Sequence, residues 1–300
     1  MYNRDRSNHM SKVYFSKTIT PERIIDMYNA LGVKLEGNVG VKVHSGEDGN
    51  QNYLRPAFLK PIINYVKGTV IECNTAYSGA RNSTEKHKAL IKKHGWTDLF
   101  NVDIMDADGY FEIAIPNGKV IKKDYLGNHL KDYDSILVLS HFKGHPMGGF
   151  GGALKQLSIG FASLEGKSYI HSAGRTLDQF DVWDKLPPQD KFLESMADAA
   201  CAVHKMYEGR ILYISLMVNM SVDCDCCEVA EDPCMKDIGI IASLDPIALD
   251  QACLDLVKKS NDPGRDHFLE RVNTRHGEHT IEAAAELGFG SREYELISID

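Results

Sequence analysis

The run Ser135-Ile136-Leu137-Val138-Leu139-Ser140 is apolar at every position between its two serines. Such a run has no polar face, so it predicts a strand whose two sides are both covered by other elements. Strands of this kind are typical of parallel sheets in proteins that alternate strands with helices. The loop that follows, residues 141–152, is rich in histidine and glycine. It lies beyond the carboxyl end of the strand, where such sheets bind ligands.

The same alternation extends through the chain on both sides of this run. Upstream, the patterns predict helices at 21–31, 56–66 and 83–94, strands at 38–44 and 69–73, and a hairpin of 111–115 with 119–122 around Pro116-Asn117-Gly118. Downstream they predict a helix from 152 to about 163, a short strand near Tyr169, helices 190–207, 247–258, 265–274 and 280–287, and strands 211–219, 238–242 and 294–299. The expected fold class is α/β, with a layered, mixed and mainly parallel sheet and helices on both faces.

Composition is that of an ordinary globular protein, with 43% hydrophobic and 25% charged residues. The net charge of −8 and the scatter of basic residues argue against nucleic acid or an anionic membrane as a partner. Seven cysteines, an odd number, favour a reducing compartment, and the expected location is the cytoplasm. Residues 10–300 are expected to form one domain, with two lobes divided near Lys131 as the alternative. Residues 1–9 are expected to be an upstream extension or a cloning remnant.

Four of the seven cysteines fall between Cys224 and Cys234, directly after the predicted strand 211–219. Thiolates this close repel one another, and nearby carboxylates add to the repulsion, so the cluster favours a soft cation. Three interpretations stay open: a four-iron four-sulfur cluster, tetrahedral zinc, or cysteines that bind no metal. Adjacent Cys226 and Cys227 are poorly placed to bind one ion together. Cys73, at the end of another predicted strand, is an alternative ligand.

A second group of residues predicts a binding site for a small anion. The glycine turn 148–152 opens a helix, so the backbone of Gly151 and Gly152 could cradle an anion next to Lys155. The alternative is that these glycines only permit a tight turn. Further candidates for this site follow predicted strands or end them: Lys42, His44, Asn74 and Thr75 for anion binding, and His141, Lys143 and His145 for catalysis.

Several segments together resemble domain-of-unknown-function family 362, a family of uncharacterised iron–sulfur-centre proteins. These segments are 10–15, 41–47, 72–77, 140–145, 148–155, 221–226 and 245–250. The resemblance implies an iron–sulfur centre and shares Cys224 and Cys226, whereas Cys227 and Cys234 are not part of the family's pattern. It therefore points to Cys73, Cys224 and Cys226 as the ligand core, completed by Cys227, Cys234, a histidine or an outside ligand. The ferredoxin-like insert of longer relatives is missing from this sequence.

Three hypotheses about function follow. The first is a redox protein whose iron–sulfur cluster lies beside a pocket for a small anionic substrate, which it activates or to which it transfers electrons. A redox partner protein belongs to this hypothesis, as electron donor or acceptor. The second is a non-redox enzyme, an isomerase or hydrolase with zinc or nickel at the same residues, and a weak architectural likeness to nickel-dependent lactate racemase keeps isomerase chemistry within it. The third is a binding or scaffold protein with structural zinc.

Overall fold

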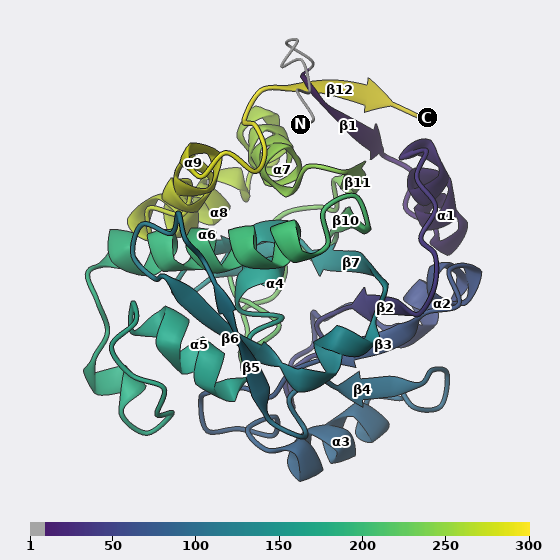
Figure 1. Ribbon diagram of the computed structural model, residues 1–300. Helices are drawn as coiled ribbons and strands as arrows, with labels where there is room; N and C mark the ends of the chain where they lie inside the picture. The colour runs from purple at the N-terminus through teal and green to yellow at the C-terminus, as the bar shows by residue number, and fades with distance from the viewer. Residues whose placement is uncertain (1–9) are drawn as a thin grey trace, which may run out of the picture.

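The computed structural model describes residues 10–300 (Figure 1). The extension expected at residues 1–9 lies outside the described residues. Within residues 10–300, eight strands form one sheet in the order β12-β1-β11-β10-β7-β2-β3-β4. Their bounds are β1 Ser11–Ser16, β2 Val39–Lys42, β3 Thr69–Glu72, β4 Val102–Ile104, β7 Ser135–His141, β10 Ile211–Met217, β11 Gly239–Ser243 and β12 Tyr294–Ser298.

The sheet is mixed because of β11 alone. This strand pairs antiparallel with both β1 and β10, while every other neighbouring pair in the sheet is parallel. In β7 the side chains of Ile136 and Val138 enter one hydrophobic cluster, and those of Leu137 and Leu139 enter another. The predicted burial of this strand on both faces is therefore confirmed.

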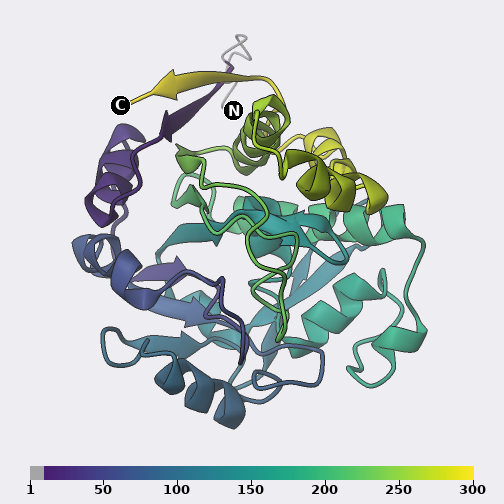
Figure 2. The same cartoon turned by 180° about the vertical axis from the view of Figure 1, so that it is seen from behind.

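Helices cover both faces of the sheet, as predicted. One cluster is completed by α1 Pro21–Ala30, α2 Pro56–Tyr65 and α3 Thr84–Lys93. The other is completed by α4 Ala153–Ser158, α6 Gln189–Met206, α7 Pro246–Lys259, α8 Arg265–Thr274 and α9 His279–Glu286. In Figure 1, α1 and α2 lie to the right of the sheet and α6, α8 and α9 to its left, and Figure 2 shows the same layers from behind. The layered α/β fold class is confirmed.

Two N-caps explain where helices begin. The Thr20 hydroxyl accepts a hydrogen bond from the Arg23 N–H, and Pro21 follows at the first position of α1. The Asp245 carboxylate accepts from the backbone N–H groups of Ile247 and Ala248 at the start of α7. Both caps were readable from the sequence, because a capping residue followed by proline is a strong local signal.

Three local predictions were wrong. Tyr169 lies in a helix, α5 Leu164–His171, and not in a strand. The helix after Gly152 ends at Ser158, and a separate turn leads to α5. The hairpin exists, but its strands are β5 Tyr110–Ala114 and β6 Lys123–Gly127, and they form a sheet of their own. A third small sheet pairs β8 Lys143–His145 with β9 Gly149–Gly151. Short 3-10 helices occur at Asn128–Asp132 and Val182–Asp184.

The displaced hairpin strand has a physical cause. The carboxylate of Asp198 on α6 accepts hydrogen bonds from the backbone N–H groups of Lys119, Val120 and Ile121, at 2.7 to 2.9 Å. These three donors are therefore not available to a strand ladder. The pairing begins only at Lys123, beyond the segment that Asp198 holds.

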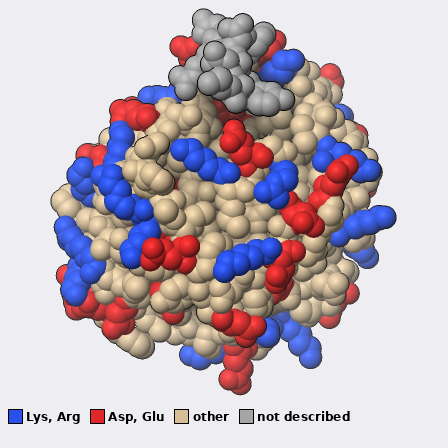
Figure 3. Space-filling view, in the orientation of Figure 1, with Lys and Arg blue, Asp and Glu red and all other residues tan. Residues whose placement is uncertain are grey.

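The topology brings four loops to one edge of the sheet. β10, β7, β2 and β3 are neighbours and run parallel, so their carboxyl ends lie at the same edge. The segments after these ends contain Cys224, His145, His44 and Cys73. On the face drawn in Figure 3, acidic and basic side chains are interspersed. None of the helices in residues 10–300 has the length and apolar character needed to cross a membrane.

Candidate metal centre and adjoining cavity

Three potential metal ligands meet at this edge of the sheet. The sulfur atoms of Cys224 and Cys226 and a ring nitrogen of His145 lie within 4.8 Å of one another. The cysteines belong to the loop after β10, whereas His145 ends β8. Two thiolates and an imidazole suit a soft or borderline metal ion. The structure therefore contains a His/Cys cluster that could bind a metal.

The place of β8 against the cysteine loop depends on Gly144. Its N–H donates to the Ser221 carbonyl at 2.8 Å. A Cβ atom at Gly144 would lie 2.2 Å from the Val222 carbonyl oxygen, so a larger residue would push β8 away from the cysteine loop. This close approach sets His145 beside the cysteines.

Hydrogen bonds fix the tautomer of His145. Its Nδ1 accepts from the backbone N–H groups of Met147 and Gly148, at 3.1 and 2.9 Å. Burial lowers the pKa of His145, so the ring is neutral near pH 7 and its single proton lies on Nε2. Nε2 lies 3.8 Å from the sulfur of Cys226. In this tautomer His145 offers an N–H group to the cysteine sulfur, and it would have to lose that proton to bind a metal through Nε2.

The cysteines differ in their readiness to ionise. Burial opposes ionisation of Cys224, but the hydrogen bond from Cys226 and the charge of Lys155 hold its pKa well below the ordinary value. The Lys155 Nζ donates to the Cys224 sulfur at 3.7 Å. The pKa of Cys226 is raised, because its thiol hydrogen-bonds to Cys224 and Cys227. The hydrogen bond from Cys226 also lowers the pKa of Cys227, so the Cys226 thiol favours ionisation of both neighbouring cysteines.

His141 and Lys143, both predicted to be catalytic, hold the residue between the two cysteines. Nδ1 of His141 lies 2.8 Å from Asp225 Oδ1, and Nε2 lies 2.6 Å from the carbonyl oxygen of Val218. Both ring nitrogens thus lie within hydrogen-bonding distance of an acceptor oxygen. Lys143 Nζ lies 3.3 Å from Asp225 Oδ2. Burial opposes ionisation of Asp225, yet His141 and Lys143 hold its pKa below the ordinary value.

A cavity of about 230 Å³ adjoins this cluster. Of the predicted residues, Lys42, His44, Cys73, Thr75, His145, Lys155, Cys226 and Cys227 line it. The remaining predicted residues are described by the structure but do not line this cavity: His141, Lys143, Asn74, Gly151, Gly152, Cys224 and Cys234. Asn74 instead hydrogen-bonds to Thr84 and His87. His141 and Lys143 therefore position the cysteine loop from behind the cavity wall.

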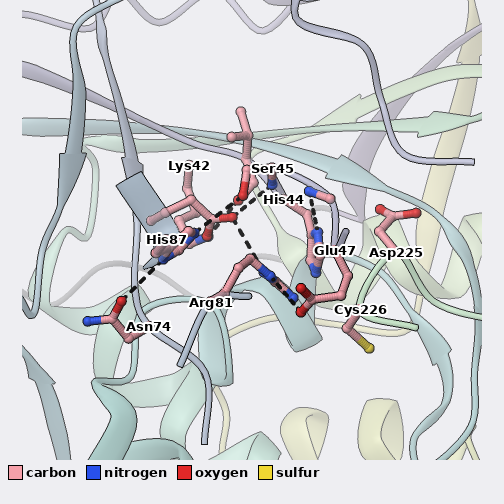
Figure 4. Close-up of polar contacts among 12 residues, drawn as sticks. Lys42, His44, Ser45, Glu47, Asn74, Arg81, His87, Asp225 and Cys226 are labelled. Atoms are coloured by element: carbon pink, nitrogen blue, oxygen red, sulfur yellow. Dashed lines mark hydrogen bonds and ion pairs between the residues drawn. The ribbon is translucent and has the colours of Figure 1, made fainter. Parts of the chain in front are cut away.

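The expected anion partner of Lys42 is internal. Lys42 Nζ forms a buried ion pair with Glu72, which ends the neighbouring strand, and Glu72 also accepts the Ser45 N–H at 2.8 Å. Burial opposes ionisation of Glu72, but Lys42 and Arg81 lower its pKa to about 2. Arg81 pairs in turn with Glu47 at 3.1 Å (Figure 4). This network fixes one wall of the cavity.

Two other cavity lysines lack such partners. Lys155 and Lys167 are 9% and 6% exposed, and no carboxylate of residues 10–300 lies within 4 Å of either ammonium group. Lys167 Nζ donates to the Ala162 carbonyl at 2.6 Å. Lys155 faces the Cys224 sulfur, whereas Lys167 has no such negative partner. A buried cation without a counter-ion is costly, so Lys167 in particular favours an anionic occupant of the cavity.

The glycine turn is not an open anion cradle. The N–H groups of Ala153 and Leu154, at the start of α4, donate to the Asp250 carboxylate at 2.8 and 2.9 Å. A Cβ at Gly152 would lie 2.4 Å from Asp250 Oδ1. The protein thus supplies its own carboxylate to this helix end, and the glycine leaves room for it. Burial raises the pKa of Asp250 to about 7.

The predicted cysteine ligands divide into two groups. Cys226, Cys227 and Cys73 border the cavity, and Cys224 contacts Cys226 directly. Cys73 is buried, its sulfur lies 3.5 Å from the Phe161 carbonyl, and burial raises its pKa. Cys234 donates to the Met220 carbonyl at 3.3 Å and packs against the core, so the structure does not bring it to the cluster.

Sequence reasoning assigned no role to three charged residues of the cavity wall: Glu72, Arg81 and Lys167. Glu72 ends β3 and Arg81 lies in the loop that follows, and no local pattern in the sequence pairs them. Lys167 was not singled out because its segment was predicted to contain a strand. In the helix α5, Lys167 and His171 lie four residues apart and share one face.

Comparison with known proteins gives the family of the chain. Two solved structures align with it weakly: a Thermotoga maritima protein with a TM-score of 0.42 and 12% identity, over 89% of this chain and 58% of that chain, and the lactate racemase apoprotein of Thermoanaerobacterium thermosaccharolyticum with a TM-score of 0.39 and 13% identity, over 69% of this chain and 51% of that one. The chain thus spans little more than half the length of either protein. No curated protein matches it. The model of a family described as domain of unknown function (DUF362) matches residues 39–255, well over half of the sequence, so the protein belongs to the DUF362 family.

Proposed function

We propose that this protein is a redox protein in which Cys224 and Cys226 hold an iron–sulfur cluster and the adjoining cavity binds a small anionic substrate. One observation carries the proposal: Cys226, which hydrogen-bonds to the Cys224 sulfur, lines a cavity in which the buried Lys155 and Lys167 have no carboxylate of residues 10–300 within 4 Å. The cluster would supply electron transfer. A redox partner protein would deliver the electrons.

The donor set fits such a group. Cys224 and Cys226 would be its firm ligands, Cys227 is adjacent, and Cys73 borders the same cavity. The Lys155 ammonium and the His145 N–H lie close to the sulfur atoms. Hydrogen bonds and charges near cluster sulfurs raise the reduction potential, because they stabilise the more negative state.

The chain's own residues would bind and orient the substrate. Lys155 contacts Cys224 and also lines the cavity, so it links the metal site to the anion site. His44 accepts the Gly46 N–H at Nδ1, at 3.1 Å, and burial lowers its pKa. Its Nε2 therefore carries the proton and offers a hydrogen bond to an anion in the cavity.

Anaerobic purification followed by iron, zinc and acid-labile sulfide analysis, with visible and EPR spectra, tests the proposal. We expect iron and sulfide in similar amounts, with broad visible absorption from charge transfer between thiolate and iron. Stoichiometric zinc without sulfide would refute the redox function.

One observation favours a second candidate, a zinc- or nickel-dependent enzyme without redox chemistry. Within residues 10–300, three donor atoms lie close enough together to bind a single ion. Three protein ligands are the usual number in a catalytic zinc site, which keeps one position open. The tautomer of His145 weighs against it, because Nε2 bears the proton. The same metal analysis separates the two candidates.

A further inference from the structure

We propose that the cavity binds a small hydroxylated carboxylate with a short hydrocarbon body, and that His171 is the residue that accepts the hydrogen bond of the ligand's hydroxyl group. This inference rests on the proposed function, since it names the ligand of the same cavity.

The carboxylate is assigned from the charges of the wall. Lys155 and Lys167 are buried and have no carboxylate of the described chain within 4 Å. The protonated Nε2 of His44 has no hydrogen-bond partner in residues 10–300 and is not enclosed. A ligand carboxylate would satisfy these donors together.

The hydrocarbon body is assigned from the apolar part of the wall. Ala76, Pro146, Met147, Ile159 and Trp183 also line the cavity, and these side chains offer no acceptors or donors beyond the indole N–H. A phosphate or sulfate ion presents oxygens in every direction and would leave several of them against apolar groups. A volume of about 230 Å³ is room for roughly eight water-sized groups, so the ligand is small.

The hydroxyl group is assigned from His171, which ends α5. Its Nδ1 donates to the Lys167 carbonyl at 2.7 Å, so the proton of the neutral ring lies on Nδ1. Nε2 then presents a lone pair, has no partner among residues 10–300, and is not enclosed. His44 and His145 present the opposite tautomer. His171 is thus the imidazole of this wall that accepts a hydrogen bond.

The environment of His171 keeps the ring neutral and fixed. Burial lowers its pKa to about 4, and the charges of Lys155 on α4 and Lys167 on the same helix also oppose a positive charge there. The ring stacks on Phe192 with centroids 5.1 Å apart. A ligand ammonium group would meet the same lysines, so the donor that reaches Nε2 is a neutral hydroxyl.

Calorimetric binding to the wild-type protein tests the ligand class with five probes: butyrate, butyramide, inorganic phosphate, and 2- and 3-hydroxybutyrate. Butyrate should bind at least about tenfold more tightly than the uncharged butyramide. One of the hydroxybutyrates should bind about fivefold more tightly than butyrate, which corresponds to one neutral hydrogen bond. Phosphate that binds as tightly as butyrate, or hydroxybutyrates that gain nothing, would overturn the assignment.

The variant His171→Phe tests the role of the residue, because it keeps an aromatic ring on Phe192 and removes the acceptor. It should bind butyrate as the wild type does and lose the fivefold gain for the hydroxylated probe. His276→Phe, at an exposed ion pair, is the matched control and should keep that gain. A gain that survives in His171→Phe would refute the inference.

Nitrogen NMR of the wild-type protein gives a test that needs no variant. His171 should show the Nδ1–H tautomer, and its Nε2 resonance should shift with the hydroxylated probe but not with butyrate. An Nε2–H tautomer would contradict the inference. Binding is measured on metal-free and on anaerobically purified protein, with metal content determined separately. A protein that contains metal but binds no carboxylate would refute this inference alone. A protein that binds the carboxylate but contains no metal would refute the proposed function alone.

Discussion

Replacing Glu72 with Gln tests the ion network that fixes the cavity wall. The change leaves Lys42, 1% exposed, without its buried counter-ion. Loss of one partner of a buried pair costs about 3–5 kcal/mol. The pKa of Glu72, about 2 against an ordinary value of 4.5, gives a similar size, about 3 kcal/mol. We therefore expect the free energy of unfolding of Glu72→Gln to fall by about 3 kcal/mol near pH 7, measured by urea denaturation.

The pH dependence supplies an independent check of the same reasoning. A carboxyl whose pKa is lowered on folding stabilises the protein above its unfolded pKa, near 4.5, and loses that contribution as the pH falls towards about 2. The gap between wild type and Glu72→Gln should therefore shrink on acidification. Burial also lowers the pKa of Lys42 below its ordinary value of 10.5. Lys42 stays protonated during acidification, so its titration does not contribute to the expected change in acid.

The double variant Lys42→Met with Glu72→Gln is the matched control for this experiment. It removes both charges, so no unpaired ammonium group stays in the core, and it should recover most of the lost stability. A loss below about 1 kcal/mol for Glu72→Gln alone, or a gap that does not narrow in acid, would refute the account of this network.

Two further predictions concern the cysteine loop. His141→Gln should lower the free energy of unfolding by about 1–3 kcal/mol, because it removes a hydrogen bond to the buried Asp225 carboxylate. His276→Gln, at an exposed pair, should change it by less than about 0.5 kcal/mol in the same denaturation assay, and equal effects of the two variants would count against the positioning role of His141. Gly144→Ala should lower the free energy of unfolding by about 1–3 kcal/mol or more, because its Cβ would lie 2.2 Å from the Val222 carbonyl oxygen. The same variant should contain less metal than the wild type. Gly148→Ala, with its nearest neighbour at 3.4 Å, should leave both quantities unchanged, and a Gly144→Ala protein with normal metal content would contradict the proposed packing.

Local sequence patterns predicted most of the fold. The apolar run of β7 and the capped starts of α1 and α7 were readable because each signal lies within a few residues. The cause of the misplaced hairpin strand is distant in sequence, since Asp198 caps a segment 77 to 79 residues away. Periodicity carries no information about such a pairing.

The candidate site was predicted in part for the same reason. Lys42, which ends β2, and His44, two residues later, both line the cavity. The glycine turn was recognised as a place for an anion, but the anion is Asp250, 97 residues from Ala153. Lys167 was not singled out because its segment was predicted to contain a strand. In the structure it lies in α5, where its carbonyl accepts a hydrogen bond from Nδ1 of His171, four residues later.

Metal content of cysteine variants tests the central claim most directly. Wild-type protein, the double variant Cys224→Ser with Cys226→Ser, and Cys234→Ser should be purified side by side without oxygen and analysed for metal and sulfide per chain. We predict equal occupancy in wild type and Cys234→Ser, since the Cys234 thiol faces the Met220 carbonyl, and none in the double variant. Equal metal in all three proteins, or loss in Cys234→Ser alone, would contradict a centre built on Cys224 and Cys226.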